Sequence, residues 1–441
     1  MSAHAVHVAT RQEILAGTVR PAPRTLKLLA LVFAAIGTIV FIIGLFVAPG
    51  RAWQALLVNW LYFTSISSAG VMFVAVQRIA TARWSRPIIR FLEGYVAFLP
   101  VALVLLALIL LVGRHHIFWW SNEVPHIHEK QIYLDPSFLI PRALIVFLII
   151  TVLSVWYVYT SVRLDVGLVP EAGAKWARGL RDRMRRGFRD ERRELHSTHS
   201  LQGRLAVFLG FAFAFGWIVL SWDLSMSLSP HFQSTMYGWW FFMGGWVTAL
   251  ASWTLIVLAW RKYLGRYDLI EEKHFHDLGK LCFAFSAFWG YLTFGQYLVI
   301  WYGNLGEETH WMRLRLIDAW RVPTLLTVGL MFFIPFFGLL SRAAKVFYPT
   351  LALFTISTVV GLWLHRYLEV YPSIYGVAHD LPLGIWELGI ALGLLGMWGF
   401  CYLAFMDAFP RMRVTLMTSP YRDEVQVPVD PRTMEPLPAH E

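Results

Sequence analysis

The chain has 441 residues, of which 57% are hydrophobic and 15% charged, with a formal net charge of +10 and a mean hydropathy of +0.54. A soluble protein would carry closer to about a quarter charged residues, and the 21 tryptophans, 32 phenylalanines and 17 tyrosines are typical of membrane interfaces. These values exclude an ordinary soluble enzyme and indicate a polytopic membrane protein. The positive charge fits the anionic lipid of an inner leaflet and needs no nucleic acid to explain it.

Ten stretches are long and apolar enough to cross a bilayer. A span needs roughly 20 apolar residues, and it must be helical because lipid offers no partner for an unpaired backbone group. The predicted spans are residues 28–47, 53–76, 88–112, 139–162, 205–222, 239–260, 281–302, 323–340, 348–368 and 383–406. The predicted fold class is therefore all-α, a polytopic membrane protein with ten transmembrane helices.

A faint internal repeat of four spans organises these helices. Because four is an even number, the two copies are parallel and related by an axis along the membrane normal. The prediction is two four-helix bundles with two flanking helices. In chain order the parts are an N-terminal tail (1–27), flanking helix 1 (28–52), the first bundle (53–222, with a basic connector at 163–204), the second bundle (223–382), flanking helix 10 (383–406) and a C-terminal tail (407–441).

The distribution of Lys and Arg predicts the topology. If the N-terminus is cytoplasmic, 30 of the 38 basic residues lie in cytoplasmic segments, which is the asymmetry that membrane proteins show. Both termini are therefore predicted to be cytoplasmic. The polar, proline-punctuated segment 1–27 lacks the apolar core and cleavage site of a signal peptide, so we interpret it as a tail.

Two charged pairs lie at predicted cytoplasmic ends of spans. Asp277 and Lys280 are three residues apart and share a helix face, as do Arg90 and Glu93. Each pair is either an interfacial ion pair, with Lys280 extending toward the headgroups, or a cytoplasmic entry for protons. Asp277, Lys280 and Glu93 are accordingly candidates for a proton path.

Three polar residues lie toward the predicted outer face. Asp223 ends a span and His231 follows it; Asp223 could cap a short helix, or the two could accept protons released from an oxidised quinol. Gln296 lies within a span, where it would bond to a neighbouring helix or donate to a quinone carbonyl. All three are candidate quinone-binding residues.

Three further ionisable residues lie close to outer span ends. His365 and Glu369 are four residues apart, with Arg366 between them, and Glu387 lies one turn inside the last span. A carboxylate at that depth is costly unless it has a partner or a function. His365, Glu369 and Glu387 join the proton-path candidates.

No metal-ligand pattern emerges from the sequence. Cys282 and Cys401 are interpreted as packing residues, and the outer-loop histidines as a solvated interface rather than a metal site: His115, His116, His126 and His128. The glycines Gly389, Gly393 and Gly396 share one side of the last span and predict close packing against another helix, which we interpret as part of a partner subunit.

Three segments together resemble a known family. They are "SWDLSMSLSPHFQSTMYG", "HDLGKLCFAFSAFWGYLTFGQYLVIWYGNLGEET" and "LPLGIWELGIALGLLG", with a weaker match at "YLDPSFLIPR". They resemble the ActF subunits of bacterial alternative complex III, within the superfamily of NrfD and polysulfide-reductase membrane subunits. Asp223, His231, Asp277, Lys280 and Gln296 fall within the matching segments.

The resemblance implies a membrane subunit of a respiratory or photosynthetic quinol:cytochrome c oxidoreductase in the bacterial inner membrane. It would bind menaquinone or ubiquinone non-covalently, hold no haem or iron–sulfur cluster, contribute a proton path and be catalytically silent alone. Its partners would be a homologous NrfD-like membrane subunit, a periplasmic iron–sulfur subunit, multihaem cytochrome c subunits and a terminal oxidase. In this family the homologous subunit is the better candidate for the quinol site. Two alternatives remain from the sequence: a secondary transporter and a purely structural anchor of a redox complex.

Overall fold

The structure, a computed structural model, describes residues 10–16, 18–122 and 130–425. This part of the chain contains ten helices long and apolar enough to span a membrane and no strands, which confirms the predicted all-α polytopic fold class. Six spans are uninterrupted helices of 24 to 33 residues: α2 (Arg24–Val47), α3 (Pro49–Ile79), α8 (Pro136–Leu168), α11 (Tyr237–Leu264), α12 (Glu272–Gly303) and α18 (Ile385–Ala408).

Two more spans are also uninterrupted helices, α10 (Glu191–Leu224, 34 residues) and α17 (Tyr348–Tyr375, 28 residues). The remaining two change helix type along their length. One is the series α4 (Ile89–Glu93), η1 (Gly94–Phe98), α5 (Leu99–Leu108), η2 (Ile109–Gly113) and α6 (Arg114–Ile117). The other is η7 (Asp318–Trp320), α14 (Arg321–Val328), η8 (Gly329–Phe333) and α15 (Ile334–Gly338).

In both interrupted spans the backbone stays helical, with a π-helical turn at η2 and at η8. Such turns are frequent at functional sites because they displace the side chains that follow. The short elements lie at the two ends of the bundle: α1 (Arg11–Leu15), α9 (Arg178–Arg185), α16 (Arg342–Val346), α19 (Val414–Thr418) and α20 (Arg422–Val425) at one end, and α7 (Gln131–Leu134) and α13 (Gly306–Leu314) at the other.

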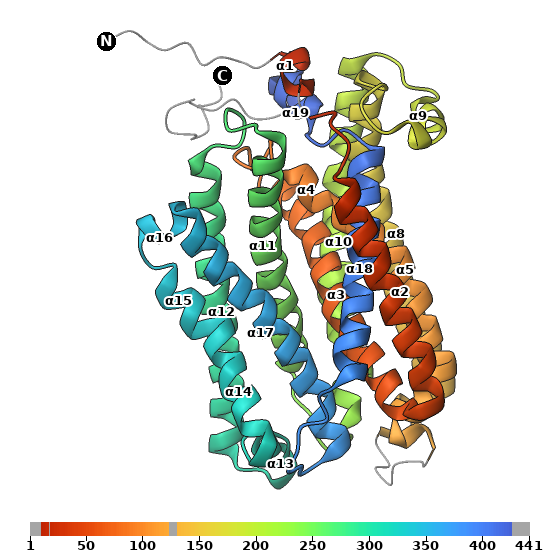
Figure 1. Ribbon diagram of the computed structural model, residues 1–441, viewed down its shortest axis with the longest axis vertical. Coiled ribbons are helices and arrows are strands. Elements are labelled where there is room, and N and C mark those ends of the chain that lie inside the picture. The colour runs from red at the N-terminus through yellow and green to blue at the C-terminus, as the bar shows by residue number, and fades with distance from the viewer. Residues whose placement is uncertain (1–9, 17, 123–129, 426–441) are drawn as a thin grey trace.

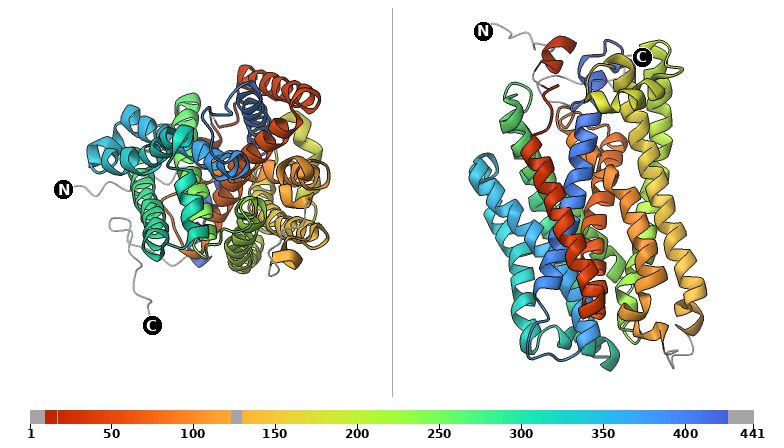
Figure 2. Two further views of the ribbon diagram at one scale, coloured as in Figure 1. Left: turned by 90° about the horizontal axis from the view of Figure 1, so that it is seen from below. Right: turned by 45° about the vertical axis from the view of Figure 1, so that its right-hand side comes forward.

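The spans run side by side in one elongated bundle (Figure 1). We call the end that carries α1, α9 and α19 the α9 end, and the opposite end, with α13, the α13 end. Helices α11, α12, α14, α15 and α17 lie together on one side, and α3, α5, α8 and α10 on the other, with α2 and α18 alongside the second group (Figures 1 and 2). The predicted topology assigns the α9 end to the cytoplasm. The domain boundaries and the repeat axis stay predictions, and the tails 1–27 and 407–441 lie partly outside the described residues.

Helix α3 is the centre of the fold. It contacts α10, α11, α17 and α18, and every side chain from Ala52 to Ala75 is buried. Several of its buried polar side chains have partners within the helix: Asn59 donates to the carbonyl of Ala55 and Ser67 to that of Phe63, at 2.8 and 2.7 Å. Small residues let neighbouring helices approach α3 closely. If Gly245 on α11 had a Cβ, that atom would lie only 2.9 Å from the Cβ of Ser65.

The glycine face of α18 packs closely, as predicted, but its partner is in the same chain. A Cβ on Gly393 would lie 2.6 Å from the Cα of Gly37 on α2, and a Cβ on Gly396 would lie 2.4 Å from the carbonyl oxygen of Ala30. The interpretation of this face as a contact for a partner subunit is therefore wrong. Helix α2, the first span, supplies the complementary small residues.

Candidate functional site

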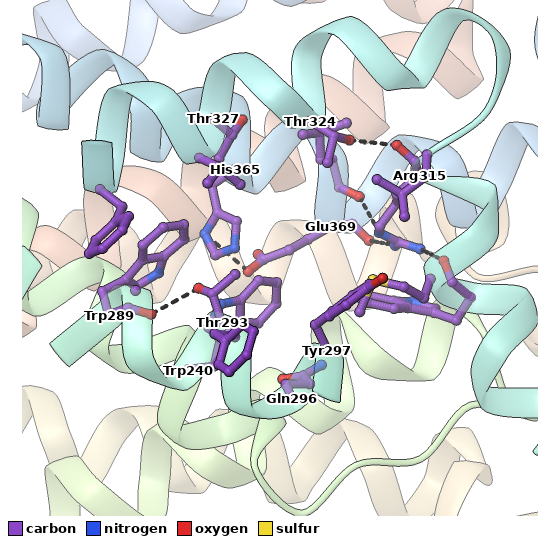
Figure 3. Close-up of a pocket in the computed structure, with 18 of the residues that line it drawn as sticks. Trp240, Trp289, Thr293, Gln296, Tyr297, Arg315, Thr324, Thr327, His365 and Glu369 are labelled. Atoms are coloured by element: carbon purple, nitrogen blue, oxygen red, sulfur yellow. Dashed lines mark hydrogen bonds and ion pairs between the residues drawn. The ribbon is translucent and has the colours of Figure 1, made fainter. Parts of the chain in front are cut away.

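An apolar cavity of about 310 Å³ lies toward the α13 end, between α11, α12, α13, α14, η8 and α17 (Figure 3). Its volume is at the lower end of the roughly 300–1,000 Å³ range of ligand pockets. The π-helical turn η8 contributes Phe332 and Phe333 to the wall. Gly290 of α12 makes room for that wall, because a Cβ there would lie 2.3 Å from the Phe332 ring.

His365 of α17 is the central polar group of this cavity, and its side chain is buried. Its ring meets two indoles edge to face, Trp240 at 4.2 Å and Trp289 at 5.4 Å between ring centroids. Neither ring nitrogen has a hydrogen-bond partner in the described part of the chain. Buried imidazoles normally have a partner, so this histidine is available to a ligand.

Glu369 lies one turn further along α17 and lines the same cavity. One terminal nitrogen of Arg366 donates to both of its carboxylate oxygens, at 2.7 and 2.9 Å. The distance from its Oε1 to the Nδ1 of His365 is 3.6 Å, beyond a hydrogen bond but close enough for charge coupling (Figure 3). Arg366 also donates to the carbonyl of Phe241 at 2.8 Å, which ties this pair to α11.

Arg315, in the turn between α13 and η7, is the main site residue that the sequence did not predict. It is buried, stacks on the Trp311 ring at 3.5 Å and donates to the carbonyls of Leu368 (3.0 Å) and Glu369 (3.2 Å). Burial lowers the pKa of Arg315 to about 9, which leaves it charged at neutral pH. The only sequence signal is a basic residue among the few on the predicted outer side.

Gln296 of α12 separates the cavity from a groove. It is buried and borders both the cavity and a groove of about 610 Å³ at the α13 end, whose other walls include Trp222 and Glu308. Its Oε1 atom has no hydrogen-bond partner among the described residues. The structure thus brings Gln296, His365 and Glu369 together, three residues that the sequence placed in two separate groups.

Asp223 and His231, the other quinone-binding candidates, are not among the described residues that line the cavity. Asp223 is fully buried and accepts from Arg142 at 2.7 and 3.0 Å and from the Tyr133 hydroxyl at 2.8 Å. This geometry ties α7 and α8 to α10. His231 is exposed in the loop that follows.

The two charged pairs at the α9 end differ in burial. Lys280 donates to Asp277 at 2.7 Å and is 55% exposed, which matches the interfacial ion pair considered from the sequence. Glu93 is fully buried. It pairs with Arg90, which also pairs with Asp165, and it accepts from the Ser161 hydroxyl at 2.8 Å. No sequence spacing predicts the contact with Asp165.

Glu387 is also held from several sides. Arg51 binds both of its carboxylate oxygens, at 2.9 and 2.6 Å, and the hydroxyl of Tyr371 donates at 3.0 Å. The backbone N–H of Gly384 donates at 2.8 Å, so Glu387 also caps α18. This carboxylate fixes three spans to one another at the α13 end.

No group of three or more potential metal ligands occurs in the part of the chain that the structure describes. His115 contacts Asn122, at 2.7 Å from its Nδ1, whereas His126 and His128 lie outside the described residues. Comparison with models of protein families and with curated proteins gives no match. The interpretation of the site therefore depends on its own geometry and chemistry.

Proposed function

We propose that the chain is a quinone-binding membrane subunit of a quinol:cytochrome c oxidoreductase, and that the cavity around His365 takes the quinone ring. The single observation that carries the proposal is an aromatic-walled cavity with a buried imidazole that has no hydrogen-bond partner among the described residues. A quinone presents two carbonyl oxygens on an apolar ring, and it reaches its site from the lipid. His365 and Gln296 offer hydrogen-bonding atoms of the kind that such a ring requires.

The chemistry needs proton acceptors beside the ring. A quinol supplies two electrons and two protons when it is oxidised. His365 would accept the protons of the two ring hydroxyls one after the other, passing the first to water before it takes the second, because neither ring nitrogen has a hydrogen-bond partner among the described residues. Glu369, at 3.6 Å, would stabilise the imidazolium that forms. The electrons would leave to redox centres of partner subunits, which the family resemblance assigns to iron–sulfur and multihaem proteins.

In this proposal the released protons leave the cavity past Gln296. It borders both the cavity and the groove at the α13 end, and a water molecule at its free carbonyl oxygen would connect the two. On the predicted topology this groove opens to the outer side of the membrane. Protons released here would thus leave on the side opposite the α9 end.

A proton path across the whole membrane is the further part of this proposal. Its candidates at the α9 end are Asp277, Lys280 and the buried Glu93. Between the two ends, α3 carries the buried hydroxyls of Ser65 and Ser68, and Arg366 reaches Ser65 at 3.5 Å. Glu387, with its four hydrogen bonds, acts in our proposal as a structural tie instead.

A cavity-filling substitution tests quinone binding. Val328 lines the cavity, whereas Val322, on the same helix, is 62% exposed on the outer surface of the bundle. We expect Val328→Phe to raise the KM for quinol at least about tenfold in the purified complex, since an added ring costs on the order of 1–3 kcal/mol when it occupies ligand space. Val322→Phe is the matched control and should leave KM unchanged.

The same pair of variants discriminates between the alternatives. A structural anchor predicts equal KM values for both variants and the unsubstituted chain, because nothing would bind in the cavity. A secondary transporter predicts that Val328→Phe impairs solute uptake into liposomes with no change in quinol oxidation. Either outcome would overturn the assignment.

A further inference from the structure

A second cavity, of about 490 Å³, lies at the α9 end, remote from the site described above. Three segments form it: residues 18–24 at the start of α2, residues 172–175 after α8, and residues 406–411 at the end of α18. Since Arg24 begins one membrane span and Ala408 ends another, this cavity lies at the boundary between the bilayer and water.

The cavity has an excess of positive charge. Arg24, Lys175 and Arg411 line it, and Asp407 is the single carboxylate among its described lining residues. Asp407 is already engaged: it pairs with Lys27, accepts from Arg411 at 2.9 Å and accepts from the backbone N–H of Ala22 at 2.7 Å. It is therefore not available to neutralise the other cations.

Arg24 and Lys175 have no hydrogen-bond or ion-pair partner within the described part of the chain, and both side chains are exposed. A further cation lies in the wall behind them. Arg181 is 3% exposed and donates to the carbonyls of Ala174 and Ala408, each at 2.9 Å. These bonds hold the 172–175 turn against the end of α18, so the charged wall is rigid before any ligand binds.

The residues next to the cavity are of the kind found beside lipid headgroups. Leu28, one turn beyond Arg24, is 62% exposed on the outer face of α2, where acyl chains lie. Trp176, next to Lys175, is 66% exposed, and tryptophan is enriched at the level of headgroups. Basic pockets between spans at this depth bind anionic headgroups.

We propose that this cavity binds the phosphate group of an anionic phospholipid, with Arg24 and Lys175 as its direct partners and the acyl chains along α2. Bound lipid would bridge Arg24 at the start of α2 and Lys175, two cations that no bond within the described part of the chain connects. The site is independent of quinone binding, so neither proposal depends on the other. Free phosphate has the same headgroup chemistry, and the experiment separates the two sources.

The test uses the full chain, purified in mild detergent and equilibrated with equal amounts of dioleoylphosphatidylglycerol and dioleoylphosphatidylcholine. Bound lipid is measured by native mass spectrometry. We expect selective retention of phosphatidylglycerol and a roughly 30-fold loss of its affinity in Arg24→Gln/Lys175→Gln, because each basic residue near anionic lipid contributes a factor of roughly five. Lys175→Gln alone, at an exposed position at the start of a short 3₁₀ helix (Lys175–Ala177), should lower the affinity for phosphatidylglycerol about fivefold.

The control variant Arg183→Gln/Arg185→Gln removes the same charge from exposed positions of α9 outside the cavity. It should retain the lipid. Equal retention by all the chains would overturn the proposal, as would retention of phosphatidylcholine as well as phosphatidylglycerol. A second arm adds millimolar inorganic phosphate: displacement of the bound phosphatidylglycerol would assign the site to free phosphate instead of lipid.

Discussion

Replacing Arg366 by methionine is expected to lower the free energy of unfolding by about 3–5 kcal/mol, the usual cost of breaking a buried ion pair from one side. Arg366 is fully buried, binds both oxygens of Glu369 and stacks on the Phe241 ring at 3.4 Å. Methionine fills much of its volume but leaves the carboxylate without its main partner. Denaturant unfolding in detergent, followed by circular dichroism, measures the effect.

Two further variants test whether the loss of stability comes from the broken ion pair. Arg366→Met/Glu369→Gln removes both charges and should recover more than half of the loss. Arg321→Met removes an exposed cation at the same end of the molecule and should change stability by less than about 0.5 kcal/mol. If Arg366→Met is as stable as Arg321→Met, the ion pair does not support the fold as described.

His365→Phe is expected to lower kcat for quinol oxidation in the assembled complex by at least about 10²-fold, the lower range for loss of a positioned acid or base. Phenylalanine keeps the edge-to-face packing against Trp240 and Trp289 but cannot take a proton. Because ring packing is preserved and only the hydrogen bond to the quinone is lost, at about 1 kcal/mol, KM should rise only about fivefold. Steady-state quinol oxidation and proton release, measured on the same preparation, provide the readouts.

His310→Phe is the control, because His310 is exposed on α13 and does not line the cavity among the described residues. It should have the activity of the unsubstituted complex. Full activity of both variants would remove His365 from the reaction. A loss in His365→Phe that is matched by a fall in its thermal stability would instead indicate a packing role.

Much of the fold follows from the sequence because hydropathy is a local property. Ten apolar stretches predicted ten spans, and the structure has ten helices of suitable length in its described part. The glycine stripe of α18 predicted close packing for the same reason: small residues let backbones approach, whichever helix is the partner. The identity of that partner, α2, depends on the tertiary arrangement and could not be read from the stripe.

The site was only partly predictable. His365 and Glu369 were found because ionisable residues stand out inside apolar spans, and Gln296 because a polar amide stands out there too. Their common cavity was not predicted, since it depends on where α12 and α17 meet. The arginines that bind the buried carboxylates were not predicted. Arg51 binds Glu387 across 336 residues of chain, and Arg142 binds Asp223 across 81. No spacing rule links residues so far apart.

Photolabelling with an azidoquinone tests the central claim, that the cavity beside His365 holds a quinone, most directly. The purified full chain is irradiated with the probe and digested, and the labelled peptides are sequenced by mass spectrometry. We expect label within residues 289–297 and 311–333, the two segments that supply most of the cavity-lining residues. Excess unlabelled quinone and Val328→Phe should each suppress it. Competed label confined to residues 221–238, around Asp223 and His231, or no competed label in the chain at all, would contradict the claim.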